Sequence, residues 1–226
     1  LGQEALLKGA RVLLAPTVNL QRTVFNGRNF ECHSEDPWLS SELAVAYVRG
    51  VQSQGVAATI KHFVGNESEY QRMTMSSDIP ERALRELYLL PFERAVKEAG
   101  VWAVMTSYNR LDGTFAADHR RLVTQVLREE WGFDGLVMTD WFAGHDTVLS
   151  VQAGTDLEMP GPARERGDKL VQAVNLDALK KQLEQVQQYV TQLEKQLPSK
   201  AEMDALLSDI NQAGLGRSLQ FELFRP

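Results

Sequence analysis

The sequence lacks most of the features that would assign a chain to a specialised class of protein. It has a single cysteine, Cys32, so no disulfide can form within the chain and a disulfide-stapled scaffold is excluded. It has no run of about 18 apolar residues, so we predict no transmembrane segment. The opening residues do not have the pattern of a signal peptide, which leaves the compartment open between cytoplasm and periplasm.

Binding motifs for common cofactors are also missing. No glycine fingerprint of the dinucleotide or Walker type occurs, which disfavours a nucleotide site. His33, His119 and His145 do not have the spacing of metal ligands, so we predict no metal and no cofactor. The net charge of −6 gives no electrostatic reason to expect nucleic acid or an anionic membrane as a partner.

Short β-rich runs alternate with helical stretches through the first three quarters of the chain. We expect strands at 11–16, 56–64, 101–108, 135–140 and 156–159, and helices at 1–9, 40–53, 80–98 and 120–130. Pro91 should kink or break the third of these helices. The alternation predicts an α/β fold with a parallel sheet, either a (β/α) barrel or a doubly wound sheet.

Polar residues follow the predicted strands at the point where each strand ends. They are Asn19, Lys61, His62, Tyr108, Asn109, Asp140 and Glu158. Because the carboxyl ends of parallel strands meet at one rim of the sheet, we expect the functional site at that rim.

Asp140 is the candidate nucleophile, because it directly follows a strand that we expect to be buried on both faces. The alternative is a structural role, in which Asp140 caps the next helix. Trp141 favours the functional interpretation, since an indole ring packs well against the C–H face of a sugar. Retaining glycoside hydrolysis uses one carboxylate as nucleophile and a second carboxyl as acid and base.

Lys61 and His62 are the next candidates. Together they can donate hydrogen bonds to vicinal hydroxyls, while the lysine charge keeps a neighbouring nucleophile ionised; a purely structural role is the alternative. Arg28 could bind substrate in the same way, or it could form a structural salt bridge with Glu31 or Asp36.

The pattern changes after about residue 171. Apolar residues then follow a heptad spacing at Leu176, Leu179, Leu183, Val186, Val190, Leu193 and Leu197. Ser199 and Glu202 form a capping box for a second helix, and residues 218–224 alternate as a strand. We therefore divide the chain into domains 1–172 and 173–226, and we expect a helical partner to bind through 176–197.

Several motifs in combination resemble glycoside hydrolase family 3, the β-glucosidase type, over about residues 1–174. They include Pro-Thr-Val-Asn at 16–19, Gly-Arg-Asn-Phe-Glu at 27–31, Ile-Lys-His-Phe-Val-Gly-Asn at 60–66 and Gly-Leu-Val-Met-Thr-Asp at 135–140. The resemblance implies an incomplete TIM-like (β/α) barrel with Asp140 as nucleophile. It also implies that six residues bind the sugar, namely Arg28, Lys61, His62, Met105, Tyr108 and Trp141.

The implied activity is removal of a terminal β-linked sugar from a β-glucoside or a related oligosaccharide. In that family the acid/base carboxylate comes from a second domain, which this sequence does not contain, so we expect the activity of the chain to be impaired.

Residues 175–226 resemble the coiled-coil region of the type IV pilus assembly protein PilO family, through Asn-Leu-Asp-Ala-Leu-Lys-Lys-Gln-Leu-Glu at 175–184 and Phe-Glu-Leu-Phe-Arg-Pro at 221–226. This implies a coiled-coil helix with a small α+β tail, and an alternative function as a non-catalytic scaffold or pilus-assembly-type protein.

Overall fold

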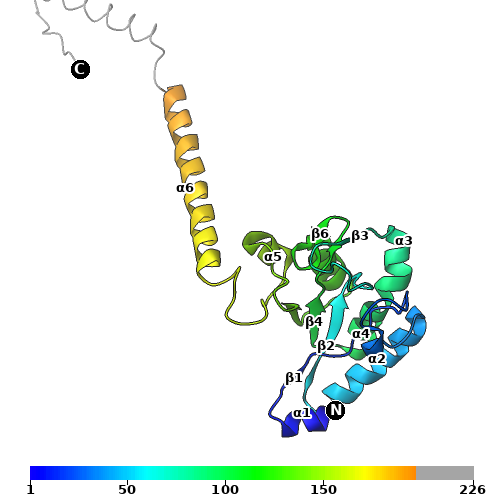
Figure 1. Cartoon of the computed structure of the whole chain (residues 1–226). Helices are drawn as coiled ribbons and strands as arrows, with labels where there is room; N and C mark the ends of the chain where they lie inside the picture. Colours follow the sequence, from blue (N-terminus) through cyan, green and yellow to red (C-terminus); the bar gives the residue numbers. More distant parts are fainter. Residues whose placement is uncertain (197–226) are drawn as a thin grey trace, which may run out of the picture. The chain divides into compact units, whose positions relative to one another are not determined.

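The computed structural model describes residues 1–196, which fall into a unit from Leu1 to Ala173 and the start of a unit that begins at Val174. The first unit has an α/β fold, as predicted, with a four-stranded parallel sheet at its centre (Figure 1). The strand order is β1 (Val12–Leu13), β2 (Ala57–Phe63), β4 (Ala103–Thr106) and β7 (Leu136–Thr139). The strand predicted at 156–159 is reduced to one parallel bridge between Leu157 and Met138.

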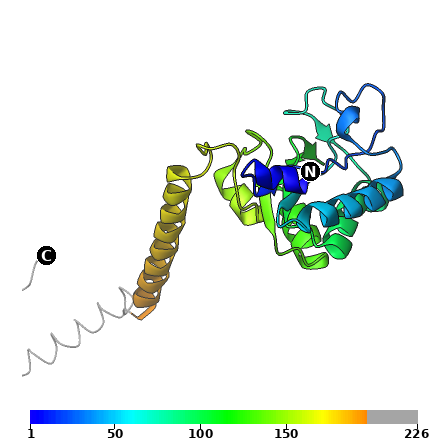
Figure 2. The same ribbon diagram turned by 90° about the horizontal axis from the view of Figure 1, so that it is seen from below.

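Helices connect the strands, as the alternation predicts. They are α1 (Gly2–Leu7), α2 (Pro37–Gln52), α3 (Glu81–Ala83), the π-helical η2 (Leu84–Tyr88), α4 (Leu90–Ala99), the π-helical η4 (Arg121–Glu130) and α5 (Thr147–Ala153). Helices α2 and α4 contact each other and both contact β2 (Figure 2). Pro91 lies in the first turn of α4, just after η2, so it interrupts the predicted helix as expected.

The local structure agrees with one prediction and departs from another. Helix α2 begins at Pro37, the residue expected to open the helix predicted near 40–53, because the Asp36 carboxylate accepts the backbone N–H groups of Trp38 and Leu39 and caps the helix there. Residues 65–77 and 109–118, where the sequence predicts neither strand nor helix, contain three short strands that form a second sheet. These are β3 (Ser76–Ser77), β5 (Arg110–Leu111) and β6 (Thr114–Phe115).

Strands β2, β4 and β7 are largely buried on both faces, which explains why most of their residues are apolar, whereas the edge strand β1 is partly exposed. On the helix side Phe63 is fully buried and makes edge-to-face contacts with Phe92 and Trp131, at centroid distances of 5.2 and 6.1 Å. The other face carries a smaller cluster of Ala103, Met105 and Met138, with Leu14 and Met159 packed against it.

Gly135 sets the position of β7. A Cβ atom at this residue would lie 2.4 Å from the Trp102 carbonyl oxygen, so only glycine fits. The close approach lets the Leu136 N–H donate to the same carbonyl at 3.0 Å and starts the pairing of β7 with β4. The pairing ends with Thr106 opposite Thr139, and Asp140 follows at the rim.

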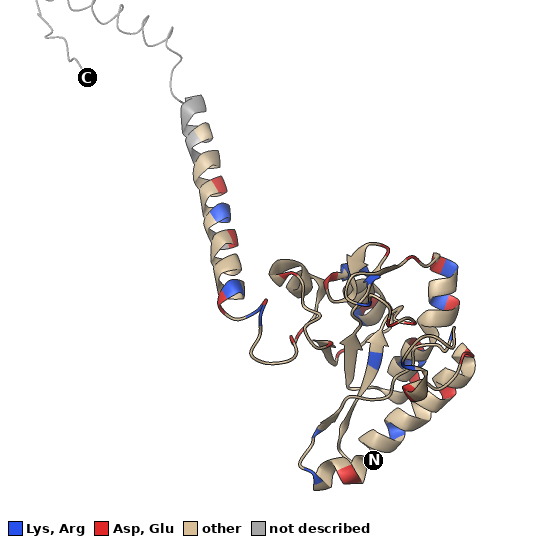
Figure 3. Ribbon diagram, in the orientation of Figure 1, with Lys and Arg blue, Asp and Glu red and all other residues tan. Residues whose placement is uncertain are grey.

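Charged residues are almost absent from the strands of the parallel sheet. These strands are mostly tan in Figure 3, where Lys and Arg are blue and Asp and Glu are red. Lys61 is the single Lys, Arg, Asp or Glu within the four strands. A charge inside a sheet is costly unless it is paired, and Lys61 Nζ lies 3.9 Å from the Glu31 carboxylate. Cis peptide bonds join Lys61 to His62 and Phe63 to Val64 in this stretch, where the pairing of β2 with β4 is irregular.

The described part of the second unit belongs to one helix, α6 (Asp168–Gln196). Four apolar residues of the predicted heptad, Leu176, Leu179, Leu183 and Val186, are between 56 and 60% exposed. Pairing of this helix with a partner stays a prediction. The second helix and the strand predicted further on lie outside the described residues. Within residues 1–196, no helix combines the length and apolarity needed to cross a bilayer.

Candidate active site

The rim at the carboxyl ends of the strands brings most of the predicted site residues together. Lys61 and His62 lie near the end of β2, Tyr108 follows β4, and Asp140 follows β7. Arg28 joins them from the loop after β1. Met105 differs from the others, because its side chain is 1% exposed and belongs to the small apolar cluster.

Asp140 is buried, with 7% of its surface exposed. Its Oδ1 accepts the backbone N–H of Trp141 at 2.7 Å. Its Oδ2 lies 3.3 Å from His62 Nε2, yet it has no hydrogen-bond partner among the described residues. Asp140 therefore carries one anchored and one free carboxylate oxygen.

Two opposing effects act on the pKa of Asp140. Burial raises the pKa, while the Trp141 N–H, the Tyr108 hydroxyl and the charges of Arg28 and Lys61 all lower it. Burial prevails, so the net pKa lies above its ordinary value. The neighbouring cations are what favours the ionised carboxylate that a nucleophile requires.

The structural alternative for Asp140 was wrong. Helix α5 follows β7, but its N-terminus is capped by Asp146, whose carboxylate accepts the N–H groups of Val148 and Leu149 at 2.8 and 2.7 Å. Asp140 is therefore not needed as a cap.

Glu31 orients the two cations of the rim. Its carboxylate contacts Arg28 Nε at 2.5 Å and Lys61 Nζ at 3.9 Å, and it accepts the Thr17 hydroxyl at 2.7 Å. Of the two salt bridges considered for Arg28, the one with Glu31 is present, whereas Asp36 caps α2. Burial acts to raise the pKa of Glu31, but the hydrogen bonds from Arg28 and Thr17 outweigh it, and the net pKa is lowered.

A second layer of charges was missed from the sequence. Glu69 lies 3.7 Å from Arg28 and 2.5 Å from Arg72, and the Arg72 guanidinium stacks 4.3 Å from the Tyr108 ring centroid. Burial and the negative charge of Asp140 raise the pKa of Tyr108 to about 12, so its phenol stays protonated. Glu69 and Arg72 lie in a loop whose sequence has no periodicity. The charged residues between 65 and 77 are the only feature of the sequence that indicates this second layer.

Two residues singled out from the sequence have structural roles. Glu158 accepts backbone N–H groups from Arg164, Glu165 and Arg166 at 2.8 to 3.1 Å and holds that loop against the rim. Burial raises the pKa of the Cys32 thiol to about 11, which keeps it protonated and unreactive at neutral pH. No cluster of three or more His, Cys, Asp or Glu side chains in residues 1–196 is arranged to hold a metal ion.

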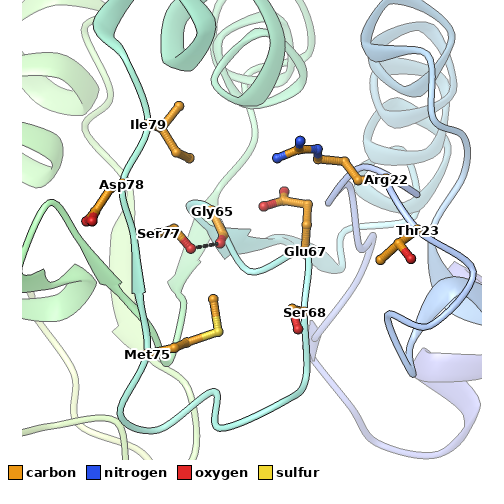
Figure 4. Close-up of a pocket in the computed structure, with 9 residues that line it drawn as sticks. All are labelled: Arg22, Thr23, Gly65, Glu67, Ser68, Met75, Ser77, Asp78 and Ile79. Atoms are coloured by element: carbon orange, nitrogen blue, oxygen red, sulfur yellow. Dashed lines mark hydrogen bonds between the residues drawn. The ribbon is translucent and has the colours of Figure 1, made fainter.

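A cavity of about 370 Å³ is lined by residues of the loops that follow β1 and β2 (Figure 4). Arg22, Glu67 and Asp78 line it, and Figure 4 shows the Arg22 and Glu67 side chains directed into the same space. None of the predicted site residues lines it, so it is separate from the sugar site predicted at the rim. Burial raises the pKa of Glu67 to about 7, despite hydrogen bonds from Asn19 and the Leu20 N–H.

Replacing Glu67 with glutamine should remove a pH-dependent loss of stability. The folded pKa of about 7 exceeds the ordinary value of 4.5, so the folded state keeps a proton that the unfolded state has lost between these pH values. Stability then falls as pH rises through this window, by about 3 kcal/mol in total, and stays low above it. We expect Glu67→Gln to raise the free energy of unfolding at pH 8 and to leave it unchanged at pH 4.

Urea unfolding at both pH values measures this effect. Glu35→Gln, which removes an exposed carboxylate, is the matched control and should behave like the unaltered chain. An equal effect of Glu67→Gln at pH 4 and pH 8 would contradict the assignment.

Comparison with known proteins identifies relatives of this arrangement. Residues 1–196 match the model of the glycosyl hydrolase family 3 N-terminal domain. A beta-glucosidase from Rhizobium radiobacter is 67% identical over 174 residues, and a probable beta-glucosidase I from Aspergillus fumigatus is 49% identical over 175 residues. Each alignment covers 77% of this chain and 21% of the relative, so the chain spans about one fifth of the length of these proteins.

Solved structures give the same result. A beta-glucosidase from Kluyveromyces marxianus in complex with glucose superposes with a TM-score of 0.75 at 44% identity, over 76% of this chain and 21% of that one. Beta-glucosidase 3B from Thermotoga neapolitana, also in complex with glucose, gives 0.73 at 49% identity, over 80% and 26%. The α/β unit therefore matches the barrel domain of this type of enzyme. The likeness of residues 175–226 to pilus proteins stays a prediction.

Proposed function

Because the chain belongs to glycosyl hydrolase family 3, we propose that its rim is the nucleophile half of a retaining β-glucosidase site. Asp140 attacks the anomeric carbon of a terminal β-linked glucosyl unit, the bond from that carbon to the leaving-group oxygen breaks, and a covalent glycosyl-enzyme forms. The observation that carries this proposal is the free Oδ2 of Asp140, which is buried beside His62 and has no hydrogen-bond partner in the described chain.

The remaining rim residues suit the binding of a sugar. Arg28 and Lys61 present cationic donors that Glu31 holds in place, and such donors bind hydroxyl oxygens. Trp141 is 36% exposed, which leaves indole surface for the apolar face of a pyranose ring. Met105 is too deeply buried to bind a hydroxyl, so we assign it a packing role beneath the site.

The second carboxyl is the incomplete part of this site. A general acid must hold a proton at neutral pH, yet Glu31 is ion-paired and its pKa is lowered by its hydrogen bonds with Arg28 and Thr17 against the effect of burial. Glu69 is likewise paired with two arginines. Loss of general-acid catalysis typically costs about 10²–10⁴-fold in rate. We therefore expect this chain to act best on glycosides whose leaving group needs no protonation.

Trapping of the covalent intermediate tests the proposal. The full chain is incubated with a 2-deoxy-2-fluoro-glucoside that carries a dinitrophenolate leaving group, then digested and sequenced by mass spectrometry. We expect one fluoroglucosyl adduct on Asp140 and none with a poor alkoxide leaving group. Absence of an adduct with the activated reagent, on a folded chain, would contradict the proposal.

Arg28→Ala should shift the pH dependence of this labelling. Attack requires ionised Asp140, and the Arg28 charge lowers the pKa of that carboxyl against the effect of burial. Without the guanidinium the pKa rises further, so the acidic limb of the labelling rate moves to higher pH. Arg82→Ala, which removes an exposed arginine on α3, is the control and should leave the profile in place. A shift to lower pH in Arg28→Ala would refute this account of Asp140.

Helix pairing through α6 is a second candidate function. Its support is the exposed apolar seam at Leu176, Leu179, Leu183 and Val186, which a second helix would cover. Sedimentation of the full chain and of Leu179→Asp distinguishes the outcomes. A dimer that the substitution dissociates supports pairing, whereas a monomer in both cases leaves the seam without this function.

A further inference from the structure

Asn19 lies at the rim after β1 and is 3% exposed. It contacts both backbone groups of His62, because its Oδ1 accepts the His62 N–H at 2.8 Å and its Nδ2 donates to the His62 carbonyl at 3.1 Å. The same Nδ2 donates to Glu67 Oε1 at 3.3 Å. The amide therefore joins the β2 rim to a buried carboxylate.

These contacts determine which way the amide faces. In the rotated amide, the NH₂ group would face the His62 N–H, and the oxygen would face both the His62 carbonyl and the Glu67 carboxylate. Both hydrogen bonds with the His62 backbone would become contacts between two donors or two acceptors. The Asn19 oxygen must therefore be the atom that faces His62.

The orientation of the amide in turn sets the tautomer of the imidazole. Asn19 Oδ1 lies 3.1 Å from His62 Nδ1, and an amide oxygen can only accept a hydrogen bond. Nδ1 must then carry the proton, and in the neutral ring Nε2 has a lone pair. Nε2 lies 3.3 Å from Asp140 Oδ2, and the two atoms form no hydrogen bond in the described chain.

We propose that Asn19 is a positioning residue that holds His62 as the neutral Nδ1–H tautomer, so that His62 Nε2 accepts a hydrogen bond from a sugar hydroxyl. The part of this inference that concerns the sugar rests on the proposed function. A proton on Nε2 would instead be donated to Asp140 Oδ2 and would occupy the oxygen needed for attack. Asn19 thereby keeps the nucleophile free.

The charges around His62 support a neutral ring. Asp140 is the acidic group that faces it, and Arg28, Lys61 and Arg72 are the basic groups. Burial, with the three cations, moves the pKa of His62 well below its ordinary value. The lone pair on Nε2 is therefore available at neutral pH.

The tautomer can be measured in the full chain without any substrate. Two-bond ¹H–¹⁵N spectra of protein labelled with ¹⁵N-histidine are recorded at neutral pH and distinguish a ring nitrogen that carries hydrogen from one with a lone pair. The signals that are missing from the spectrum of His62→Gln are those of the His62 ring. We expect hydrogen on Nδ1 and a lone pair on Nε2. Hydrogen on Nε2, or on both nitrogens, would overturn the proposal.

Substitution of Asn19 tests its role. In Asn19→Ala the acceptor for Nδ1 is gone, so we expect the proton to move to Nε2 in at least part of the population. Asn109→Ala removes another fully buried amide, which contacts the Val64 carbonyl and Ser77 and not His62, and it should keep the Nδ1–H signature. A pure Nδ1–H ring in Asn19→Ala, or loss of that ring in Asn109→Ala, would overturn the role of Asn19.

Glucose titration separates this inference from the proposed function. We expect glucose to perturb the His62 signals, with affinity about tenfold weaker in Asn19→Ala, the effect of one lost hydrogen bond. Asn109→Ala should retain the affinity of the unaltered chain. An Nδ1–H ring that does not respond to glucose would overturn the sugar site while supporting the tautomer. Unchanged glucose affinity in Asn19→Ala would overturn the link between the two.

Discussion

Asp140→Ala is expected to abolish covalent labelling of the chain by the activated fluoro-glucoside. The methyl group left behind cannot attack the anomeric carbon, and Glu31 and Glu69 are both ion-paired with Arg28. The labelling rate should therefore fall to background, with no adduct at any other residue. Intact-mass spectrometry over time measures the loss directly.

Two variants make this result specific. Asp134→Ala removes an exposed carboxylate before the opposite end of β7 and should label at the rate of the unaltered chain. Asp140→Asn keeps the shape of the side chain and the acceptor for the Trp141 N–H, but it lacks the carboxylate and should also remain unlabelled. Labelling of Asp140→Asn without deamidation would refute the assignment of the nucleophile.

Phe63→Ala should have the largest effect on stability. The Phe63 ring is fully buried at the centre of the main core and contacts Phe92 and Trp131 edge to face. Removing a buried phenylalanine ring typically costs about 3–5 kcal/mol, through lost transfer energy and the cavity that remains. Domains are stable by only about 5–15 kcal/mol, so this loss removes a substantial part of the free energy of unfolding and lowers the denaturant midpoint.

Phe25→Ala is the matched control for this substitution. Its ring is 89% exposed, so the same chemical change should alter the free energy of unfolding by less than about 0.5 kcal/mol. Denaturant unfolding followed by circular dichroism compares the two variants. Equal stabilities of Phe63→Ala and Phe25→Ala would contradict the description of the core.

The parallel sheet could be predicted because its signals are local. Continuous apolar runs followed by polar residues identify β2, β4 and β7, and the geometry of a parallel sheet then gathers their carboxyl ends at one rim. This placed Asp140, Lys61, His62 and Tyr108 near one another before any coordinates. Asp140 was a candidate nucleophile from its position directly after a buried strand.

The second layer could not be predicted, because it depends on loops and on exact side-chain contacts. Glu31, Glu69 and Arg72 lie in segments without periodicity, and their pairing with Arg28 and Tyr108 follows from tertiary packing. Helix α5 was missed for a related reason, since a helix of seven residues is too short to show an apolar period. Asn19 was recognised as a polar residue that follows a predicted strand. Its hydrogen bonds with the backbone N–H and carbonyl of His62 could not be predicted, because His62 lies on a strand that is distant in the sequence.

The spacing of the Asn19 contacts has a consequence for biosynthesis. Its hydrogen bonds join residues 43 and 48 positions apart, and the carboxylate of the site comes from β7, the last of the four parallel strands to leave the ribosome. Closing such long loops lowers the conformational entropy of the chain before the contacts that stabilise the closed loop have formed. The imidazole and the carboxylate can meet only after translation has passed residue 140. The complete sugar site therefore forms only after the earlier strands are made, so the pairing of β1, β2 and β4 depends on their backbone hydrogen bonds and apolar packing and not on a sugar bound beside Asp140.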